Sequence, residues 1–194
     1  LELKTGLFFE DKVRDFGARN IGYVKSTPSF RTTLPIDQLF SAQNFNTRTG
    51  IRVDEQTNPN DSYDASNTLL AGYLSANYAL GKKFNVIAGV RAEQNSQKLN
   101  SADLVGKAIN YDNTRLDLLP SMNLTYNFTE KSLLRLAYGK TLNRPEFREL
   151  APFSFYDFVN NRTVSGNPTL KNANIDNFDF RYEFYPTPSE LISI

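Results

Sequence analysis

The side chains best suited to binding a ligand gather in residues 144–158. Arg144 and Arg148 carry guanidinium groups, whose planar fork pairs with carboxylates and phosphates. Aromatic rings follow a few residues later and could stack on a ligand such as a sugar. These rings belong to Phe153, Phe155, Tyr156 and Phe158. The segment is therefore a candidate ligand-binding site, in which the arginines orient an anionic group and the rings supply contact area.

A structural interpretation of the same residues also stays open. Arg144 and Arg148 could form salt bridges, for instance with Glu146 or Glu149. The rings could pack on one another and only hold the shape of the loop. The residue types alone do not separate the two interpretations.

A second candidate is the acidic stretch "DEQTNPNDSYD", which begins at Asp54. Oxygen-rich loops can hold calcium, but this stretch lacks the ligand order and the glycine of an EF-hand. We interpret it as a solvated surface loop, and we expect no metal site and no cofactor.

The composition argues against an enzyme. The 194 residues contain no histidine and no cysteine, which removes the commonest general base, the Ser-His-Asp triad and thiolate chemistry. The formal net charge is +1, so no strongly basic surface for nucleic acid is expected. We expect a binding protein rather than a catalyst.

The surrounding segments read as long β-strands. In "RLDLLPSMNLTYNF", residues 115–128, every second residue is apolar, which is the period of a strand with two different faces. The same alternation occupies 69–80, 84–93, 134–138 and 177–184, and a less regular strand is expected over 3–24. The turn Gly81-Lys82-Lys83 should pair Leu80 with Phe84 and Tyr78 with Val86.

About seven strands are expected, and the connections between them alternate in length. Short connections are predicted at 81–83, 129–133 and 185–189, and long ones at 25–67, 99–114 and 143–173. Short turns at one end and long loops at the other are typical of an up-and-down transmembrane barrel, with periplasmic turns and extracellular loops. We predict an all-β fold: an incomplete, antiparallel up-and-down transmembrane β-barrel.

The apolar face is expected to meet lipid and the polar face a wet lumen. None of the apolar-face positions in the five clearest strands is charged, and the strands reach the length of about 9–11 residues that a tilted membrane strand needs. Aromatic residues near the short turns would form a girdle at the membrane interface. They are Tyr78, Phe84, Tyr126, Phe128, Phe184 and Tyr185. A soluble β-sandwich would show the same two faces and remains an alternative.

Two stretches, "LRLAYGKTLNRPEFRELAPF" at 134–153 and "GNPTLKNANIDNFDFRYEFYP" at 166–186, resemble the late barrel region of TonB-dependent outer-membrane receptors of the Bacteroidetes type. In that family an ascending strand ends in Arg-Pro, matched by Arg144-Pro145. A Gly-Asn-Pro-x-Leu-Lys segment follows, and 166–171 match it. The Pro-Glu that usually comes next is replaced by Asn172-Ala173.

The resemblance implies a receptor that imports a scarce nutrient across the cell outer membrane: an iron chelate, vitamin, glycan or peptide. It further implies an N-terminal plug, an energy-coupling box and a barrel of about 22 strands. We therefore expect residues 1–194 to be one part of a barrel domain, cut at both ends. The implied partners are outer-membrane lipid, the TonB complex through the missing N-terminal region, a small nutrient and a surface lipoprotein. A barrel that serves as a scaffold or adhesin without transport remains an alternative.

Overall fold

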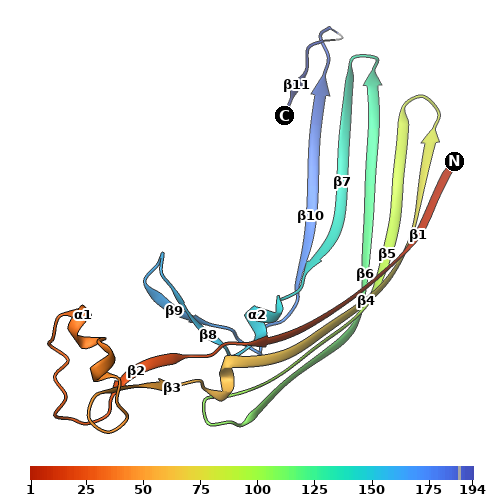
Figure 1. Ribbon diagram of the computed structural model, residues 1–194. Helices are drawn as coiled ribbons and strands as arrows, with labels where there is room; N and C mark the ends of the chain where they lie inside the picture. The colour runs from red at the N-terminus through yellow and green to blue at the C-terminus, as the bar shows by residue number, and fades with distance from the viewer. Residues whose placement is uncertain (188) are drawn as a thin grey trace.

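The computed structural model describes residues 1–187 and 189–194. Within these residues, seven strands form one antiparallel sheet in the order β1-β4-β5-β6-β7-β10-β11. The strands are β1 Glu2–Gly17, β4 Ser62–Leu80, β5 Phe84–Ala102, β6 Ala108–Thr129, β7 Ser132–Asn143, β10 Ala173–Phe184 and β11 Ile192–Ser193. Figure 1 shows them side by side as a curved wall, with short turns at the top, and with the long β1–β4 and β7–β10 connections at the bottom. The predicted antiparallel up-and-down sheet is confirmed.

The expected hairpin registers are also confirmed. Leu80 pairs with Phe84, Tyr78 with Val86 and Leu74 with Val90. Gly81 opens the connecting turn with a φ of 67°, a conformation that L side chains rarely adopt. The next hairpin closes more tightly than predicted, because β6 continues to Thr129 and β7 starts at Ser132, with a register shift between Asn127 and Thr129.

The predicted long loop over 99–114 is wrong. Strands β5 and β6 stay paired as far as Ala102 and Ala108, so the connection is only residues 103–107. Asp103 closes it by accepting hydrogen bonds from the backbone N–H groups of Val105 and Lys107. The segment 3–24 also contains a break, since β1 ends at Gly17 and β2 begins at Ile21.

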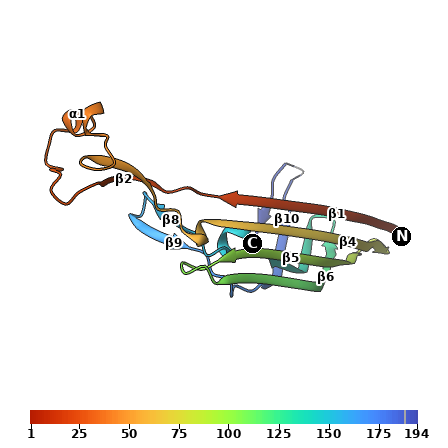
Figure 2. The same ribbon diagram turned by 60° about the horizontal axis from the view of Figure 1, so that its bottom comes forward.

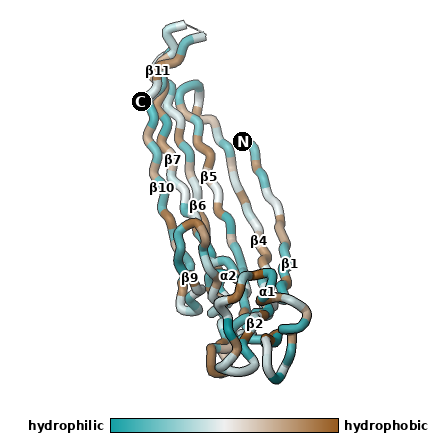
Figure 3. The backbone as a smooth tube through the Cα atoms, turned by 60° about the vertical axis from the view of Figure 1, so that its left-hand side comes forward, coloured by the Kyte–Doolittle hydropathy of each residue, from teal (hydrophilic) through white to brown (hydrophobic). Residues whose placement is uncertain are grey.

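The wall has one apolar face and one polar face. The alternation is visible along β4 to β10 in Figure 3. Large apolar side chains of the outer face are exposed and have no protein layer over them. They include Leu3, Leu7, Phe9, Leu70, Leu74, Val90, Leu116, Leu118, Phe178 and Phe180. A sheet with this much exposed apolar surface on one side is suited to lipid contact.

Aromatic pairs mark the short-turn end of the apolar face. The rings of Phe84 and Tyr126 stack with centroids 4.4 Å apart, and Phe128 packs edge-on against Tyr126 at 4.6 Å. Near the other end, Tyr138 contacts Phe178 and donates a hydrogen bond of 2.8 Å to Asp176. In β7 and β10 the outer face turns polar beyond this pair, at Lys140 and Asp176, whereas in β6 it stays apolar as far as Leu116.

Two connections at the long-loop end have structure of their own. The arm, residues 18–61, contains the hairpin β2 Ile21–Lys25 with β3 Ile51–Glu55, the short helix α1 Ile36–Leu39, and 3-10 turns at Ala42–Asn44 and Pro59–Asp61. The mouth loop, residues 144–172, contains α2 Phe147–Leu150 and the hairpin β8 Ser154–Asp157 with β9 Arg162–Ser165. Figure 2 shows the arm extending past the end of the sheet. Among the described residues, no helix has the length and apolar character to span a bilayer.

Candidate functional site

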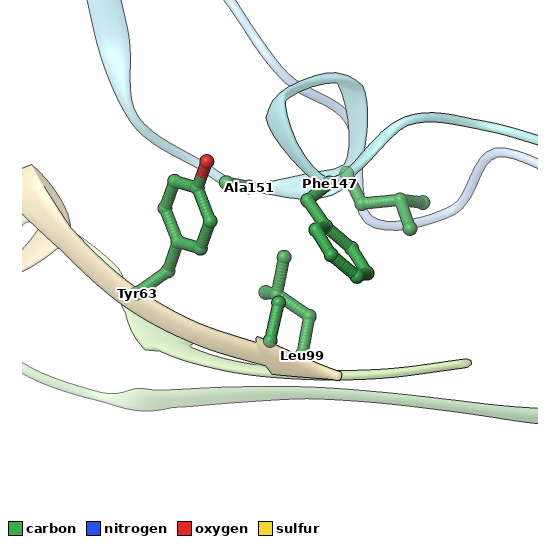
Figure 4. Packing of buried hydrophobic residues seen from close by; sticks show 6 residues of the cluster. Tyr63, Leu99, Phe147 and Ala151 are labelled. Atoms are coloured by element: carbon green, nitrogen blue, oxygen red, sulfur yellow. The ribbon is translucent and has the colours of Figure 1, made fainter. Parts of the chain in front are cut away.

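The mouth loop folds back onto the polar face of the wall through a small apolar core. Leu150 and Ala151 of the loop are fully buried against Tyr63, Ala65 and Leu99 of strands β4 and β5. Figure 4 shows Tyr63 and Leu99 rising from the strands toward Phe147 and Ala151. Burying one such leucine contributes about 1.5–3 kcal/mol. This cluster is the strongest apolar contact between loop and wall.

Two side-chain amides, one from the wall and one from the base of the arm, hold the loop on either side of α2. The buried side chain of Gln97 donates from Nε2 to the carbonyl of Pro145 over 2.8 Å. Asn60, also buried, donates from Nδ2 to the carbonyl of Pro152 over 3.2 Å. Proline has no N–H, so its carbonyl is the only backbone group that each segment can offer to the amide. The stretch 145–152 is thus fixed at both ends.

An arginine adds an electrostatic anchor at the same place. Glu93 and Asp117 are both buried and lie directly opposite each other on β5 and β6. Like charges in that position repel. The guanidinium of Arg144 lies between them, with Nη2 2.7 Å from Glu93 and 3.5 Å from Asp117. Each carboxylate also pairs along its own strand at 2.6 Å, Glu93 with Arg91 and Asp117 with Arg115.

Gly166 connects the end of the mouth loop to its beginning. A Cβ at this position would lie 2.1 Å from the carbonyl oxygen of Ala151 and 2.7 Å from that of Arg148. The next residue, Asn167, donates its backbone N–H to the carbonyl of Glu149 over 2.6 Å. Only glycine allows this approach. The Arg-Pro and Gly-Asn-Pro motifs are therefore two halves of one packed unit.

Arg148 and Phe155 are the two predicted site residues that lie together at an open cavity of the loop. The guanidinium carbon of Arg148 lies 3.5 Å from the centre of the Phe155 ring, a cation–π contact. Both residues line an open cavity of about 370 Å³, together with Glu149, Val164, Asn167 and Leu170. The cavity combines a cation, an aromatic ring and apolar walls.

The other predicted site residues lie elsewhere. Phe153 faces the wall, with its ring 4.9 Å from that of Phe16. Tyr156 and Phe158 pack edge to face at the β8–β9 hairpin, where Phe158 is 86% exposed, and Tyr156 donates a hydrogen bond to Asn161. The six predicted site residues are therefore not in one place. Arg144 and Phe153 contact the wall, Arg148 and Phe155 line the cavity, and Tyr156 and Phe158 lie at the β8–β9 hairpin. Whether they bind a ligand stays a prediction.

The salt-bridge partners of Arg144 are Glu93 and Asp117, whereas the sequence suggested Glu146 or Glu149. Reasoning from the sequence missed these partners, and it also missed Gln97 and Asn60. The alternation does place Glu93 and Asp117 on the polar face, and this pattern could have marked them as possible partners of Arg144. Because the sequence predicts a long loop between β5 and β6, it gives no register for this pair of strands and does not show that the two carboxylates face each other.

The acidic stretch is built into the base of the arm. Arg19 donates two hydrogen bonds to Glu55, of 2.9 and 2.6 Å, and this pairing, with a further hydrogen bond from Thr57, lowers the pKa of Glu55 to about 2. Asp61 accepts from the side chain of Asn20 and from the backbone N–H of Asn58. Within the described residues, no group of three or more candidate ligands could hold a metal ion.

The arrangement supports binding at the end of a membrane-facing wall. The wall offers lipid an apolar face, its polar face carries paired charges, and a packed loop closes down on that face at the long-loop end.

Comparison with known proteins agrees with this geometry. A search of curated proteins found no match. A family model described as the outer membrane protein beta-barrel family matches residues 32–192, which is most of the chain. The chain therefore belongs to the outer membrane protein β-barrel family, and its sheet is a barrel wall of the outer membrane.

Proposed function

We propose that this chain is part of a TonB-dependent receptor that imports a scarce nutrient across the outer membrane. The Arg-Pro and Gly-Asn-Pro motifs that resemble that family carry the proposal. They meet in one packed unit, in which Gly166 touches the end of α2 and Arg144 reaches the polar face of the wall. A loop fixed over the lumen suits a receptor that captures its ligand at the mouth. A freely open pore has no need of such a loop.

The proposal implies binding without covalent chemistry. A nutrient held at the mouth and lumen would be released inward when the energy-coupling partner acts on the plug of the complete receptor. The proposed partners are the TonB complex, a small nutrient such as an iron chelate, vitamin, glycan or peptide, and a surface lipoprotein.

Growth of gene-deletion strains tests the function. The host lacking this gene and the host lacking its TonB protein are each grown on limiting iron chelates, vitamins, glycans and peptides. We expect the gene deletion to abolish growth on one nutrient class, and the TonB deletion to reproduce that loss. If neither deletion affects any nutrient while surface attachment fails, the protein is a scaffold or adhesin.

Alanine at Phe155 and Tyr156 in the complete receptor tests the candidate ligand residues. Phe155 lines the cavity beside Arg148, whereas Tyr156 lies on the opposite face of β8. We expect Phe155→Ala to weaken nutrient binding per folded receptor by about tenfold, the loss of roughly one ring contact. Tyr156→Ala should leave affinity nearly unchanged. Reduced surface expression with unchanged affinity for both variants would make the rings structural only.

A further inference from the structure

The outer part of the arm is basic. Residues 21–53, here called the arm tip, carry the exposed cations Lys25, Arg31, Arg48 and Arg52, and their single carboxylate is Asp37. Among the described residues, none of these four cations forms a salt bridge. By contrast, the base of the arm has Arg19 fully engaged with Glu55. The free positive charge is thus concentrated where the chain extends furthest from the sheet (Figure 1).

A tight turn places three of the cations at the same end of the β2–β3 ribbon. Ser26, next to Lys25, donates its backbone N–H to the carbonyl of Gly50 over 2.8 Å and its hydroxyl to the carbonyl of Asn46 over 2.7 Å. The turn 46–50, which carries Arg48, therefore lies against the strand end that carries Lys25. Arg52 lies opposite Val24, one residue away in the register.

Aromatic rings accompany these charges at the arm tip. Tyr23 packs edge to face on Phe40 at 5.1 Å and on Phe45 at 5.8 Å between ring centroids. Each ring remains at least 40% exposed, although the three pack on one another. Their contacts hold the arm tip in shape and leave ring surface open to a partner.

Two of the cations, Lys25 and Arg52, lie on opposite faces of the β2–β3 ribbon. Successive residues of a strand point to opposite sides, and paired residues share a side. Lys25, paired with Ile51, is therefore on one face, and Arg52, paired with Val24, is on the other. A folded protein partner would cover one face and engage only one of these two cations. A linear, flexible polyanion can contact both.

We propose that the arm tip binds a linear polyanionic polysaccharide outside the cell. Its carboxylate or sulfate groups pair with Lys25, Arg31, Arg48 and Arg52, and its sugar rings stack on the exposed parts of Tyr23, Phe40 and Phe45. The site lies on the arm, away from the mouth loop, and is independent of any nutrient that the mouth takes.

Binding of labelled heparin to the complete receptor in nanodiscs tests this, with neutral dextran and poly-glutamate as comparison probes. The arm-tip variant replaces Lys25, Arg31, Arg48 and Arg52 with Gln. The matched control replaces Lys82, Lys83, Lys98 and Lys107 with Gln, which removes equal charge elsewhere. We expect heparin to bind the wild type and the control, the arm-tip variant to bind about tenfold more weakly, and added salt to weaken binding. Dextran should not bind.

Three outcomes would overturn the proposal. Equal loss of heparin binding in both variants would mean a response to net charge alone. Tighter binding of poly-glutamate than of heparin, lost in the arm-tip variant, would assign the surface to an acidic protein. Absence of heparin binding to a correctly folded wild type at low salt would remove the site altogether. Folding of each variant is checked by the heat-dependent gel mobility of the barrel.

Discussion

At the scale of single residues, Arg144 is notable because its guanidinium lies between two buried carboxylates. Its guanidinium compensates two buried carboxylates that the pairing of β5 with β6 forces to face each other. A buried ion pair contributes little net stability compared with an apolar replacement, yet removing one partner alone leaves an uncompensated charge. Arg144 therefore matters more for where the mouth loop sits than for how stable the barrel is.

Replacing Arg144 with Met should release the mouth loop. The loss of the cation leaves Glu93 and Asp117 opposed, with Arg91 and Arg115 as their remaining partners, at a cost of at most about 3–5 kcal/mol to the docked loop. Hydrogen exchange of the complete receptor in nanodiscs should show faster exchange over 145–152, with the wall strands still protected. Arg148→Met is the control, because Arg148 contacts Phe155 within the loop. Adding Glu93→Gln and Asp117→Asn to Arg144→Met should restore protection. Equal effects of the two single variants would contradict the anchor.

Alanine at Gly166 should also loosen the mouth loop, through sterics instead of charge. A methyl group would meet three backbone carbonyl oxygens within 2.8 Å, and forced overpacking costs about 1–3 kcal/mol. Limited proteolysis of the complete receptor measures this as faster cleavage between 151 and 166. Gly139→Ala is the matched control, since a Cβ there meets nothing within 4 Å. If both variants are cleaved at the wild-type rate, the close approach at Gly166 does not hold the loop.

At the scale of elements, the arm and the mouth loop are fixed in different ways. The mouth loop is held by an apolar core, by hydrogen bonds from the side-chain amides of Gln97 and Asn60, and by the ion pairs of Arg144. The base of the arm is held by polar groups: the exposed pair of Arg19 with Glu55, and the hydrogen bond from Asn20 to the buried carboxylate of Asp61. Exposed polar contacts are weak and respond to solution conditions. The arm should therefore be the element most sensitive to acid.

Acidification should open the base of the arm before it affects the wall. The pKa of Glu55 is about 2 in the folded protein and near 4.5 without its partners. A depressed pKa gives stability that is fully present above about pH 4.5 and is lost as the pH falls toward 2. Protease cleavage within 18–61, with an enzyme active over this range, should rise across that window. In Glu55→Gln the cleavage rate should no longer depend on pH there. The same pH dependence in both proteins would exclude the Arg19–Glu55 pair as its cause.

At the scale of the whole molecule, the two faces of the sheet separate two environments. The outer face exposes leucine, valine and phenylalanine over about the strand length that crosses a bilayer. The inner face pairs its charges along strands, as in Arg181 with Glu183 at 3.2 Å, and packs the mouth loop at one end. Charge on the outer face should therefore be costly, and charge on the inner face tolerated.

Arginine at Leu124 tests the assignment of the faces. Leu124 lies on the outer face, where a mid-bilayer arginine on a barrel costs about 2–4 kcal/mol. Ser121, on the same strand, lies on the inner face between Gly89 and Gly139, which leave room for a longer side chain. Refolding titrations of the complete receptor in lipid vesicles should show the loss for Leu124→Arg and little change for Ser121→Arg. Equal losses would mean that the faces are misassigned.

The sequence by itself determined the strands through the membrane zone, their antiparallel pairing across short turns, and which face meets lipid. These follow from local periodicity: an alternation of two residues selects a face, and a three-residue turn fixes Leu80 opposite Phe84. In the parts of the strands that extend beyond the membrane, the alternation of apolar and polar residues no longer indicates the two faces. In β4 the apolar positions change from even to odd there, because Tyr63 and Ala65 point inward to the mouth loop. In β5 and β6 both faces become polar there, so the sequence pattern predicts a loop where the structure has a paired hairpin.

Only the tertiary structure decided how the mouth loop is held. Arg144 and Glu93 are 51 residues apart, and Gln97 and Pro145 are 48 apart. Such contacts depend on the register of β5 against β6 and on the return of the chain over the polar face, neither of which leaves a local pattern. The sequence showed that Arg144 could pair with a carboxylate. The fold brought Glu93 and Asp117 within its reach, because the pairing of β5 with β6 places the two carboxylates opposite each other, where a cation between them weakens their repulsion.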